Sequence, residues 1–307
     1  MGLRIKTNIS SINSQRHLGN STRTLRGSMT RLASGNRINK AADDAAGLAV
    51  SENLHADIRS LRMARRNTLD GISLVQTAEG GLVETTNMLV RLRELAVQAA
   101  SDTIGNRERE FLDKEFLQLK DEIDRIANAT EFNGTRLLVG ETDMPQDMDK
   151  GPNAFPLEIQ VSKDYYPKSD AMEKRNPVNI IKVDFRDINA FTSGDKSLEI
   201  GEHTEGTRVH RKVDAQRSIE SLDEAIYRVN NHRAYLGAIQ NRLTSTMSNL
   251  DVQVENLSES RSRIRDTDFA QETAVMTQAN ILQQAGTSVL STANSQPQIA
   301  LSLLNRG

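Results

Sequence analysis

Apolar residues recur at alternating intervals of three and four along two long stretches of the chain. The first stretch runs from about residue 44 to residue 100, and the second from about residue 213 to residue 257. This spacing predicts long helices that pair through a narrow apolar seam, as in coiled coils. The first seam consists of Leu54, Ile58, Leu61, Ile72, Val75, Leu82, Leu89 and Ala96. The second consists of Ala215, Ile219, Leu222, Ile226, Val229, Leu236, Leu243, Met247, Leu250, Val254 and Leu257.

The two stretches could pair antiparallel within one molecule, because their lengths match. A helix over the first stretch extends for roughly 85 Å at the standard rise per residue, too far for one compact domain. The seams also include the polar residues Arg65, Glu79, Arg233 and Gln240. Such residues fix the register of a helix pair or accept a neighbour's charge, at some cost in stability.

A further helix is predicted after the turn residues at 102–106, and it can pack back onto the first. Its apolar stripe consists of Leu112, Phe116, Leu119, Ile123 and Ile126. The sequence FNG at residues 132–134 then predicts a turn.

The middle of the chain has a different pattern, because five of the six prolines lie between Pro145 and Pro177. Apolar and polar residues alternate here, as they do in strands that are half-buried. The alternating apolar residues are Phe155, Leu157, Ile159 and Val161 in one segment and Ile181, Val183 and Phe185 in another. We therefore expect a small β-hairpin region, too short for a large outer domain.

Both ends of the chain predict thin amphipathic helices. Residues 1–42 contain no acidic residue, and residues 273–305 contain no charged side chain. Such helices bury little apolar area and should be marginal alone, so we expect them to become ordered on assembly. The N-terminal seam residues are Leu18, Leu25, Met29 and Leu32. The C-terminal seam residues are Val275, Leu282, Ala285, Val289, Ile299 and Leu303.

The predicted fold is mainly α, a long antiparallel coiled-coil rod with a small β-hairpin region and terminal helices that order on assembly. Its predicted segments are an N-terminal polymerisation segment (1–42), N-terminal rod helices (43–140), a β-hairpin and irregular central region (141–212), a C-terminal rod helix (213–265) and a C-terminal polymerisation segment (266–307). Seams left open on one copy can be filled by its neighbours, and neighbours related by an operation that does not close form a helical filament.

Composition argues against several classes of function. The chain has no cysteine, which excludes disulfides and thiolate sites, and its five histidines lack the spacing of a metal site. The opening lacks the apolar core of a secretory signal, and no apolar run is long enough to cross a membrane. We therefore expect no enzyme activity, no cofactor, no metal and no membrane partner.

The basic N-terminal stretch permits several interpretations. It could form a nucleic-acid arm, a membrane-surface helix, a docking strip for an acidic partner or simply a solvated helix face. The stretch lacks aromatic residues that stack on bases, and no nucleic-acid motif follows it, so we expect no nucleic-acid partner.

Several longer motifs resemble bacterial flagellins, the subunits of the flagellar filament. At the N-terminal side they are TNISSINSQRHLGNS, RLASGNRINKAADDAAGLAVSE, RLRELAVQAAS and EIDRIANATEFNGTRLL. At the C-terminal side they are SRIRDTDFAQE, ILQQAGTSVLSTAN and PQIALSLL. Together they cover about two thirds of the chain in the family's order. A flagellar hook-filament junction protein is the alternative, but such proteins diverge in the C-terminal motifs that this chain keeps.

The resemblance implies a secreted, extracellular protein that polymerises with itself into the filament used for swimming motility. The terminal segments would form the inner layer around an export channel, and the rod helices the layer around it. Export would use the flagellar type III apparatus. An export chaperone would cover the C-terminal segment, including Ile281, and hook-junction and cap proteins would be further partners.

The resemblance also points to an innate-immune receptor. The stretch with Arg91 and Leu95, together with Glu115 on the next helix, resembles the surface that Toll-like receptor five recognises in enteric flagellins. Val90 stands where a glutamine is common there. The alternative is that these residues serve only contacts within the filament.

Overall fold

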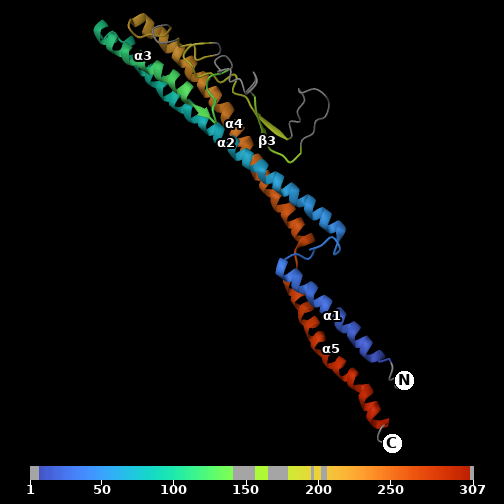
Figure 1. Cartoon of the computed structure of the whole chain (residues 1–307). Coiled ribbons are helices and arrows are strands. Elements are labelled where there is room, and N and C mark those ends of the chain that lie inside the picture. Colours follow the sequence, from blue (N-terminus) through green and yellow to red (C-terminus); the bar gives the residue numbers. More distant parts are fainter. Residues whose placement is uncertain (1–6, 141–155, 165–178, 195–196, 202–205, 305–307) are drawn as a thin grey trace, which may run out of the picture. The chain divides into compact units, whose positions relative to one another are not determined.

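The chain forms two compact units in this computed structural model, which describes residues 7–140, 156–164, 179–194, 197–201 and 206–304, with side chains up to residue 296. We call residues 1–58 with 255–307 the terminal unit and residues 59–254 the central unit. Figure 1 labels the main elements. The helices are α1 (Ile9–Ser34), α2 (Ala45–Ala100), α3 (Asn106–Ala129), α4 (Lys212–Arg265) and α5 (Phe269–Leu304). The strands are β1 (Glu131–Phe132), β2 (Thr135–Arg136), β3 (Leu157–Gln160) and β4 (Ile180–Val183).

Three of the helices begin at residues whose side chains accept free backbone N–H groups. The Asn8 side chain accepts a hydrogen bond from the Ser11 backbone N–H at the start of α1, which ends at Gly35 with a φ of 70°. At the start of α2, Asp44 accepts from the Gly47 N–H at 2.8 Å. Asp268 accepts from the Ala270 N–H at 2.8 Å at the start of α5. The lengths of α2 and α4, 56 and 54 residues, confirm the two long helices predicted from the apolar spacing.

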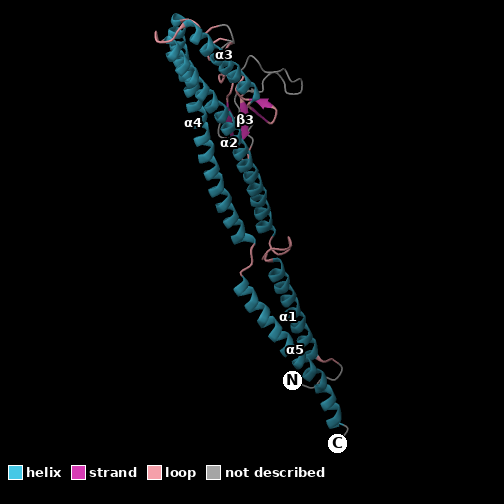
Figure 2. Ribbon diagram, turned by 90° about the vertical axis from the view of Figure 1, so that its left-hand side faces the viewer, coloured by secondary structure: helices cyan, strands magenta, loops and turns pink. Residues whose placement is uncertain are grey.

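Within the central unit, α2 and α4 pair antiparallel, as predicted, with α3 folded back beside them (Figure 2). Arg65 contacts Asp251 at 2.6 Å, and Arg93 contacts Asp223 at 2.6 Å. The same number of residues separates the two arginines along α2 and the two aspartates back along α4. Because both ion pairs fit the same register, α2 and α4 pair continuously between them. Arg65 pairs with a charge on the neighbouring helix, as predicted from its seam position.

The core of the central unit lies between these three helices and the segments after β4. On α4, the predicted seam residues at every seventh position from Ala215 to Leu250 are buried, and Leu257 is half-buried. The buried positions between them include Ser218, Ala225 and Ile239, whereas the predicted Ile219 and Ile226 are only partly buried. The fully buried seam residues include Val75, Leu82, Leu89 and Ala96 on α2 and Leu222, Val229, Leu236 and Leu243 on α4.

Two small antiparallel hairpins follow α3. In the first, Asn133 and Gly134 connect β1 to β2 with φ angles of 50° and 76°, the left-handed conformation that an Asn-Gly hairpin turn requires. The predicted turn at residues 132–134 is confirmed. In the second, β3 pairs with β4 so that Ile159 faces Ile181. Both strands match the predicted alternation, while Phe155 lies outside the described residues.

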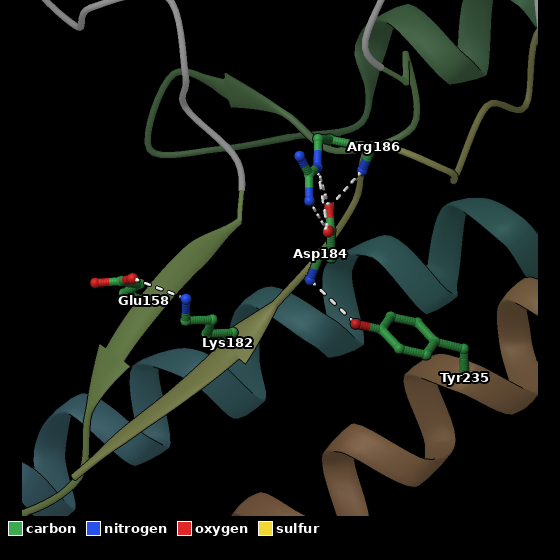
Figure 3. Close-up of polar contacts among 5 residues, drawn as sticks. All are labelled: Glu158, Lys182, Asp184, Arg186 and Tyr235. Atoms are coloured by element: carbon green, nitrogen blue, oxygen red, sulfur yellow. Dashed lines mark hydrogen bonds and ion pairs between the residues drawn. The ribbon is translucent and has the colours of Figure 1, made fainter. Parts of the chain in front are cut away.

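The β3–β4 hairpin is fixed to both long helices. Figure 3 shows the Glu158–Lys182 pair across the strands and the Tyr235 hydroxyl of α4 accepting the Asp184 backbone N–H at 3.1 Å. In the same view Arg186 folds back onto the Asp184 carboxylate at 2.6 Å. On the α2 side, a Cβ at Gly71 would collide with the Ile159 side chain. The end of the Ile159 side chain would have to move to admit a larger residue at position 71.

The buried face of α3 carries charges that the apolar pattern did not predict. Arg109 donates to the carbonyl oxygens of Ala99 and Ser101, both at 2.8 Å, and so satisfies the end of α2. Asp113 pairs with Arg208 at 2.5 Å and accepts the Val209 backbone N–H at 3.0 Å. Burial alone would raise the pKa of Asp113, but the hydrogen bonds from Arg208 and Val209 outweigh it and lower the pKa.

Lys120 and Asp124 continue this face and hold the segment that precedes α4. Lys120 is fully buried and donates to the Thr207 carbonyl oxygen at 3.3 Å. Burial lowers the pKa of Lys120 from 10.5 to about 8, against the opposing effect of Asp124. Asp124 accepts from the N–H and hydroxyl of Thr192, at 2.8 and 2.7 Å. Burial nevertheless raises the pKa of Asp124.

Replacing Lys120 with methionine is expected to remove a pH dependence from the free energy of unfolding, because methionine has a similar length and no group that titrates. Lys120 keeps its proton to higher pH in the unfolded chain than in the folded one. The native protein should therefore gain about 1–3 kcal/mol of stability relative to the variant as pH rises through 8 toward 10.

Urea unfolding of both proteins at several pH values measures this difference. Lys114→Met is the matched control, since Lys114 is an exposed lysine on the same helix. A constant difference between native protein and K120M from pH 7 to 10 would show that the Lys120 charge is not desolvated.

Candidate self-assembly surface

The terminal unit is built on α1 and α5, which lie side by side and run antiparallel (Figure 1). At one end, the Asn8 amide donates to the Ala293 carbonyl oxygen at 2.7 Å, and the Ser11 hydroxyl donates to Asn294 Oδ1 at 2.7 Å. At the other end, Arg31 lies 3.6 Å from Glu272. Each terminal helix therefore has a partner within the chain.

The faces that α1 and α5 turn toward each other carry few large apolar side chains. On α1 this face combines leucines with the buried hydroxyls of Ser11 and Ser28. On α5 it includes Ala279 and Ala293, both buried, and Gly286, where a Cβ would meet the Leu18 side chain at 3.3 Å. Small residues allow the helices to approach closely but bury little area, so the pair gains little stability from the hydrophobic effect.

The predicted N-terminal seam residues lie mainly on the inner side of α1. Leu25 is buried and Leu18 and Leu32 are half-buried, whereas the Met29 side chain is 52% exposed. Ile9 and Ile12 are also more than half exposed on this helix. Apolar side chains therefore remain uncovered on α1 after it has paired with α5.

The predicted C-terminal seam residues lie mainly away from α1. Leu282 is 51% exposed, Val289 is 56% exposed, Ala285 is exposed and Val275 is half-buried. The side chains of Ile299 and Leu303 lie outside the described residues, although both positions belong to α5.

Successive residues of a helix are turned by about 100°, so α5 presents three distinct faces. The inner face meets α1. A second face, which we call the apolar face, is exposed and consists of Ala270, Ala274, Ile281, Leu282, Ala285 and Val289. A third face, which we call the polar face, is exposed and consists of Thr273, Thr277, Asn280, Gln284, Thr287 and Ser291.

A shallow groove of about 580 Å³ lies on the exposed side of α5. It is lined by Ala270, Ala274, Ile281 and Leu282 of the apolar face, by Thr273 and Thr277 of the polar face, and by Gln278. Contiguous exposed apolar side chains such as Ile281 and Leu282 are typical of surfaces that bind another protein. Phe269, at the start of the same helix, is 58% exposed as well.

The helices of the terminal unit are joined by a short two-stranded contact. The Arg37 backbone N–H donates to the Arg265 carbonyl oxygen at 2.7 Å, and the Thr267 N–H donates to the Gly35 carbonyl oxygen at 2.9 Å. Ile38 is buried, and its side chain lies close to Gly47 of α2. Beside this contact, backbone N–H groups of Lys40 and Asn39 lower the pKa of Asp43 by hydrogen bonding to its carboxylate.

The residues predicted for receptor recognition lie in the central unit and differ in accessibility. Arg91 and Glu115 are exposed and contact each other at 2.8 Å across α2 and α3. This hydrogen bond is the main reason that the pKa of Arg91 is raised. Leu95 is only 1% exposed and packs in the core. A partner that approaches this surface therefore meets the Arg91–Glu115 pair and not Leu95.

Two other kinds of site, a metal-binding cluster and a membrane-spanning helix, are absent from the described residues. Nowhere in them do three His, Asp or Glu side chains gather closely enough to hold a metal ion. None of the helices in this part of the chain is both long and apolar enough to span a lipid bilayer.

Paired long helices with an exposed apolar face are typical of helical structural proteins. Comparison with known proteins gives the family. The family model of the bacterial flagellin N-terminal helical region matches residues 5–143, and that of the C-terminal helical region matches residues 219–304. The chain therefore belongs to the bacterial flagellin family, whose members are structural subunits of the extracellular flagellar filament and not enzymes.

Relatives match over nearly the whole chain. A flagellin of Halalkalibacterium halodurans is 41% identical over 98% of this chain and 99% of its own length. A flagellin of Bacillus subtilis is 38% identical over 98% of this chain and 100% of its own length. The flagellar filament 33 kDa core protein of Treponema phagedenis is 38% identical over 98% of this chain and 99% of its own length.

Two solved structures are similar as well. The Bacillus cereus flagellin is 32% identical over 60% of this chain and 88% of its own, with a TM-score of 0.44. A putative flagellar hook-associated protein from Vibrio parahaemolyticus is 14% identical over 73% of this chain and 100% of its own, with a TM-score of 0.53. At that identity the second likeness concerns the fold alone.

Proposed function

We propose that this chain is a filament subunit that is exported by the flagellar type III apparatus and polymerises outside the cell through its terminal segments. Residues 1–42 and 266–307 form the inner layer of the filament. Residues 43–140 and 213–265 form the layer around it, and residues 141–212 supply the β-hairpin and irregular region. Membership of the flagellin family supports this assignment.

The observation that carries the proposal is the exposed apolar face of α5. Ile281, Leu282 and Val289 are each more than half exposed although α5 already has a partner helix. Neighbouring copies cover this face, and burying it supplies the free energy of polymerisation. The polar face of α5 stays in water and lines the export channel, since Asn, Gln, Thr and Ser side chains remain hydrated there.

The same apolar face accounts for the proposed chaperone. An apolar surface that binds other copies would assemble too early if it were open inside the cell. A flagellar export chaperone therefore covers Ile281, Leu282, Val289 and Leu303 before export. Hook-junction and cap proteins lie at the two ends of the polymer, so they contact the same terminal segments.

Toll-like receptor five is a further proposed partner of the central unit. Arg91 and Glu115 offer it an exposed pair of opposite charges, and filament contacts through the same pair are the competing explanation. Leu95 supports the helix from inside the core.

The double substitution Ile281→Asn with Leu282→Asn tests the polymerisation surface. We expect a soluble monomer that does not extend filament seeds, because an amide cannot be buried against an apolar neighbour without losing its hydrogen bonds. Negative-stain microscopy and pelleting measure the outcome. The matched control is Gln284→Asn with Thr287→Asn on the polar face, which should polymerise like the native chain. Normal filament growth by the Ile281 and Leu282 variant would contradict the proposal.

A further inference from the structure

The Asn8 side chain uses both ends of its amide group. Its Oδ1 accepts the Ser11 backbone N–H at 3.0 Å and so starts α1. Its Nδ2 donates to the Ala293 carbonyl oxygen of α5 at 2.7 Å, across 285 residues of sequence. One side chain therefore both begins the N-terminal helix and attaches it to the C-terminal helix.

The carbonyl that Asn8 reaches is a special one in α5. In an α-helix each carbonyl oxygen accepts the backbone N–H four residues later. The residue four positions after Ala293 is Pro297, which lies within α5 and has no backbone N–H. Pro297 is the single proline between residues 269 and 304. The interior of α5 therefore offers Asn8 one carbonyl whose usual donor is missing, and the Asn8 amide supplies the replacement.

A second contact lies beside the first and is buried. Ser11, whose side chain is 7% exposed, donates its hydroxyl to Asn294 Oδ1 at 2.7 Å. Asn294 is the neighbour of Ala293, so the two hydrogen bonds join the start of α1 to a single turn of α5. This polar attachment matters because the apolar contact between α1 and α5 is small.

We infer that Asn8 and the Ala293 carbonyl, which Pro297 leaves without its backbone donor, form a clasp that sets the register of α1 on α5, and with it the alignment of the terminal helices in the polymer. The contacts of Leu18 with Gly286 and of Arg31 with Glu272 follow the same register. Sliding α1 by one turn would place the Asn8 amide against a carbonyl that is already bonded. It would also leave the Ala293 carbonyl without a donor. The small side chains along the helix pair impose no comparable cost on such a change of register.

The inference rests on the proposed function, because alignment of the terminal helices matters only if they assemble. A double-mutant cycle with Asn8→Ser and Pro297→Ala tests it in filaments of the full chain. Serine still caps α1 but is too short to reach Ala293. Alanine at position 297 restores the missing N–H, so the Ala293 carbonyl no longer needs Asn8.

The free monomer concentration that remains after seeded growth measures the effect. We expect N8S to raise it about tenfold, the effect of leaving one buried carbonyl unpaired. In the P297A background the same N8S substitution should change it less than about threefold. An equal effect of N8S in both backgrounds, or no effect in either, overturns the clasp. Failure of the native chain itself to extend seeds would instead overturn the proposed function.

Disulfide cross-linking between introduced cysteines reports the register directly, because the chain has no cysteine of its own that could form other disulfides. Ser14 and Leu290 are half-buried and lie between the Ser11–Asn294 and Leu18–Gly286 contacts. A chain with Ser14→Cys and Leu290→Cys should form the intramolecular disulfide in filaments. After addition of N8S, this cysteine pair should cross-link less. A second pair, Ser14→Cys with Ala293→Cys one turn away, should cross-link more. Unchanged cross-linking of both pairs after N8S overturns the inference.

Discussion

Deleting residues 284–307 is expected to abolish polymerisation while leaving a soluble protein with an intact central unit. The deletion removes the second half of α5, including Val289 of the apolar face and the Ala293 carbonyl that binds Asn8. The α1 helix then loses the end of its partner, and a helix of this composition is marginal alone. The central unit keeps its own core, which contains none of the described side chains of α1 or α5.

Pelleting after addition of filament seeds measures polymerisation, and thermal melting by circular dichroism reports the central unit. Deleting only residues 305–307, which follow α5, is the matched control and should leave assembly unchanged. Filaments of normal length from the larger truncation would contradict the assignment of the terminal segments.

The second large effect is expected for Leu243→Asp, which should lower the free energy of unfolding of the central unit by about 5 kcal/mol. Leu243 is fully buried on α4 near Gly71 of α2. The substitution removes apolar contacts and places a carboxylate in the core without a partner for its charge. Guanidinium unfolding of the monomer measures the loss.

Two controls separate the position from the chemistry. Leu243→Met preserves apolar volume and should cost less than about 1.5 kcal/mol. Val252→Asp introduces the same carboxylate on the same helix at a side chain that is 56% exposed, so stability should hardly change. Equal unfolding of L243D and the native protein would mean that α2 and α4 do not pair through this seam.

The elements of the fold could be predicted from local sequence because each has a local cause. Apolar residues at intervals of three and four define α2 and α4, and Asn133 with Gly134 defines the first hairpin turn. The second hairpin followed from alternation in Leu157, Ile159 and Val161. Such signals need only neighbours in the chain, so they survive without knowledge of the fold.

The buried side of α3 could not be predicted in the same way. Its apolar stripe suggested an ordinary core face, yet Asp113 and Lys120 are buried there beside Phe116. Their partners, Arg208 and the Thr207 carbonyl, come from a segment almost one hundred residues later. A charged residue is stable at such a position only when a distant segment supplies its hydrogen bonds, and no local pattern reveals that segment.

The sequence by itself determined that this protein is a set of long helices with weak, uncharged or basic ends, and its motifs identified the flagellin family. Only the tertiary structure decided which faces of those helices remain open. Leu25 faces α5 while Leu282 and Val289 face away from α1, although all three were assigned to one kind of seam. It also decided that Asn8 meets Ala293. Spacing fixes which residues share a face of a helix, whereas the partner that covers this face depends on packing between segments distant in the chain.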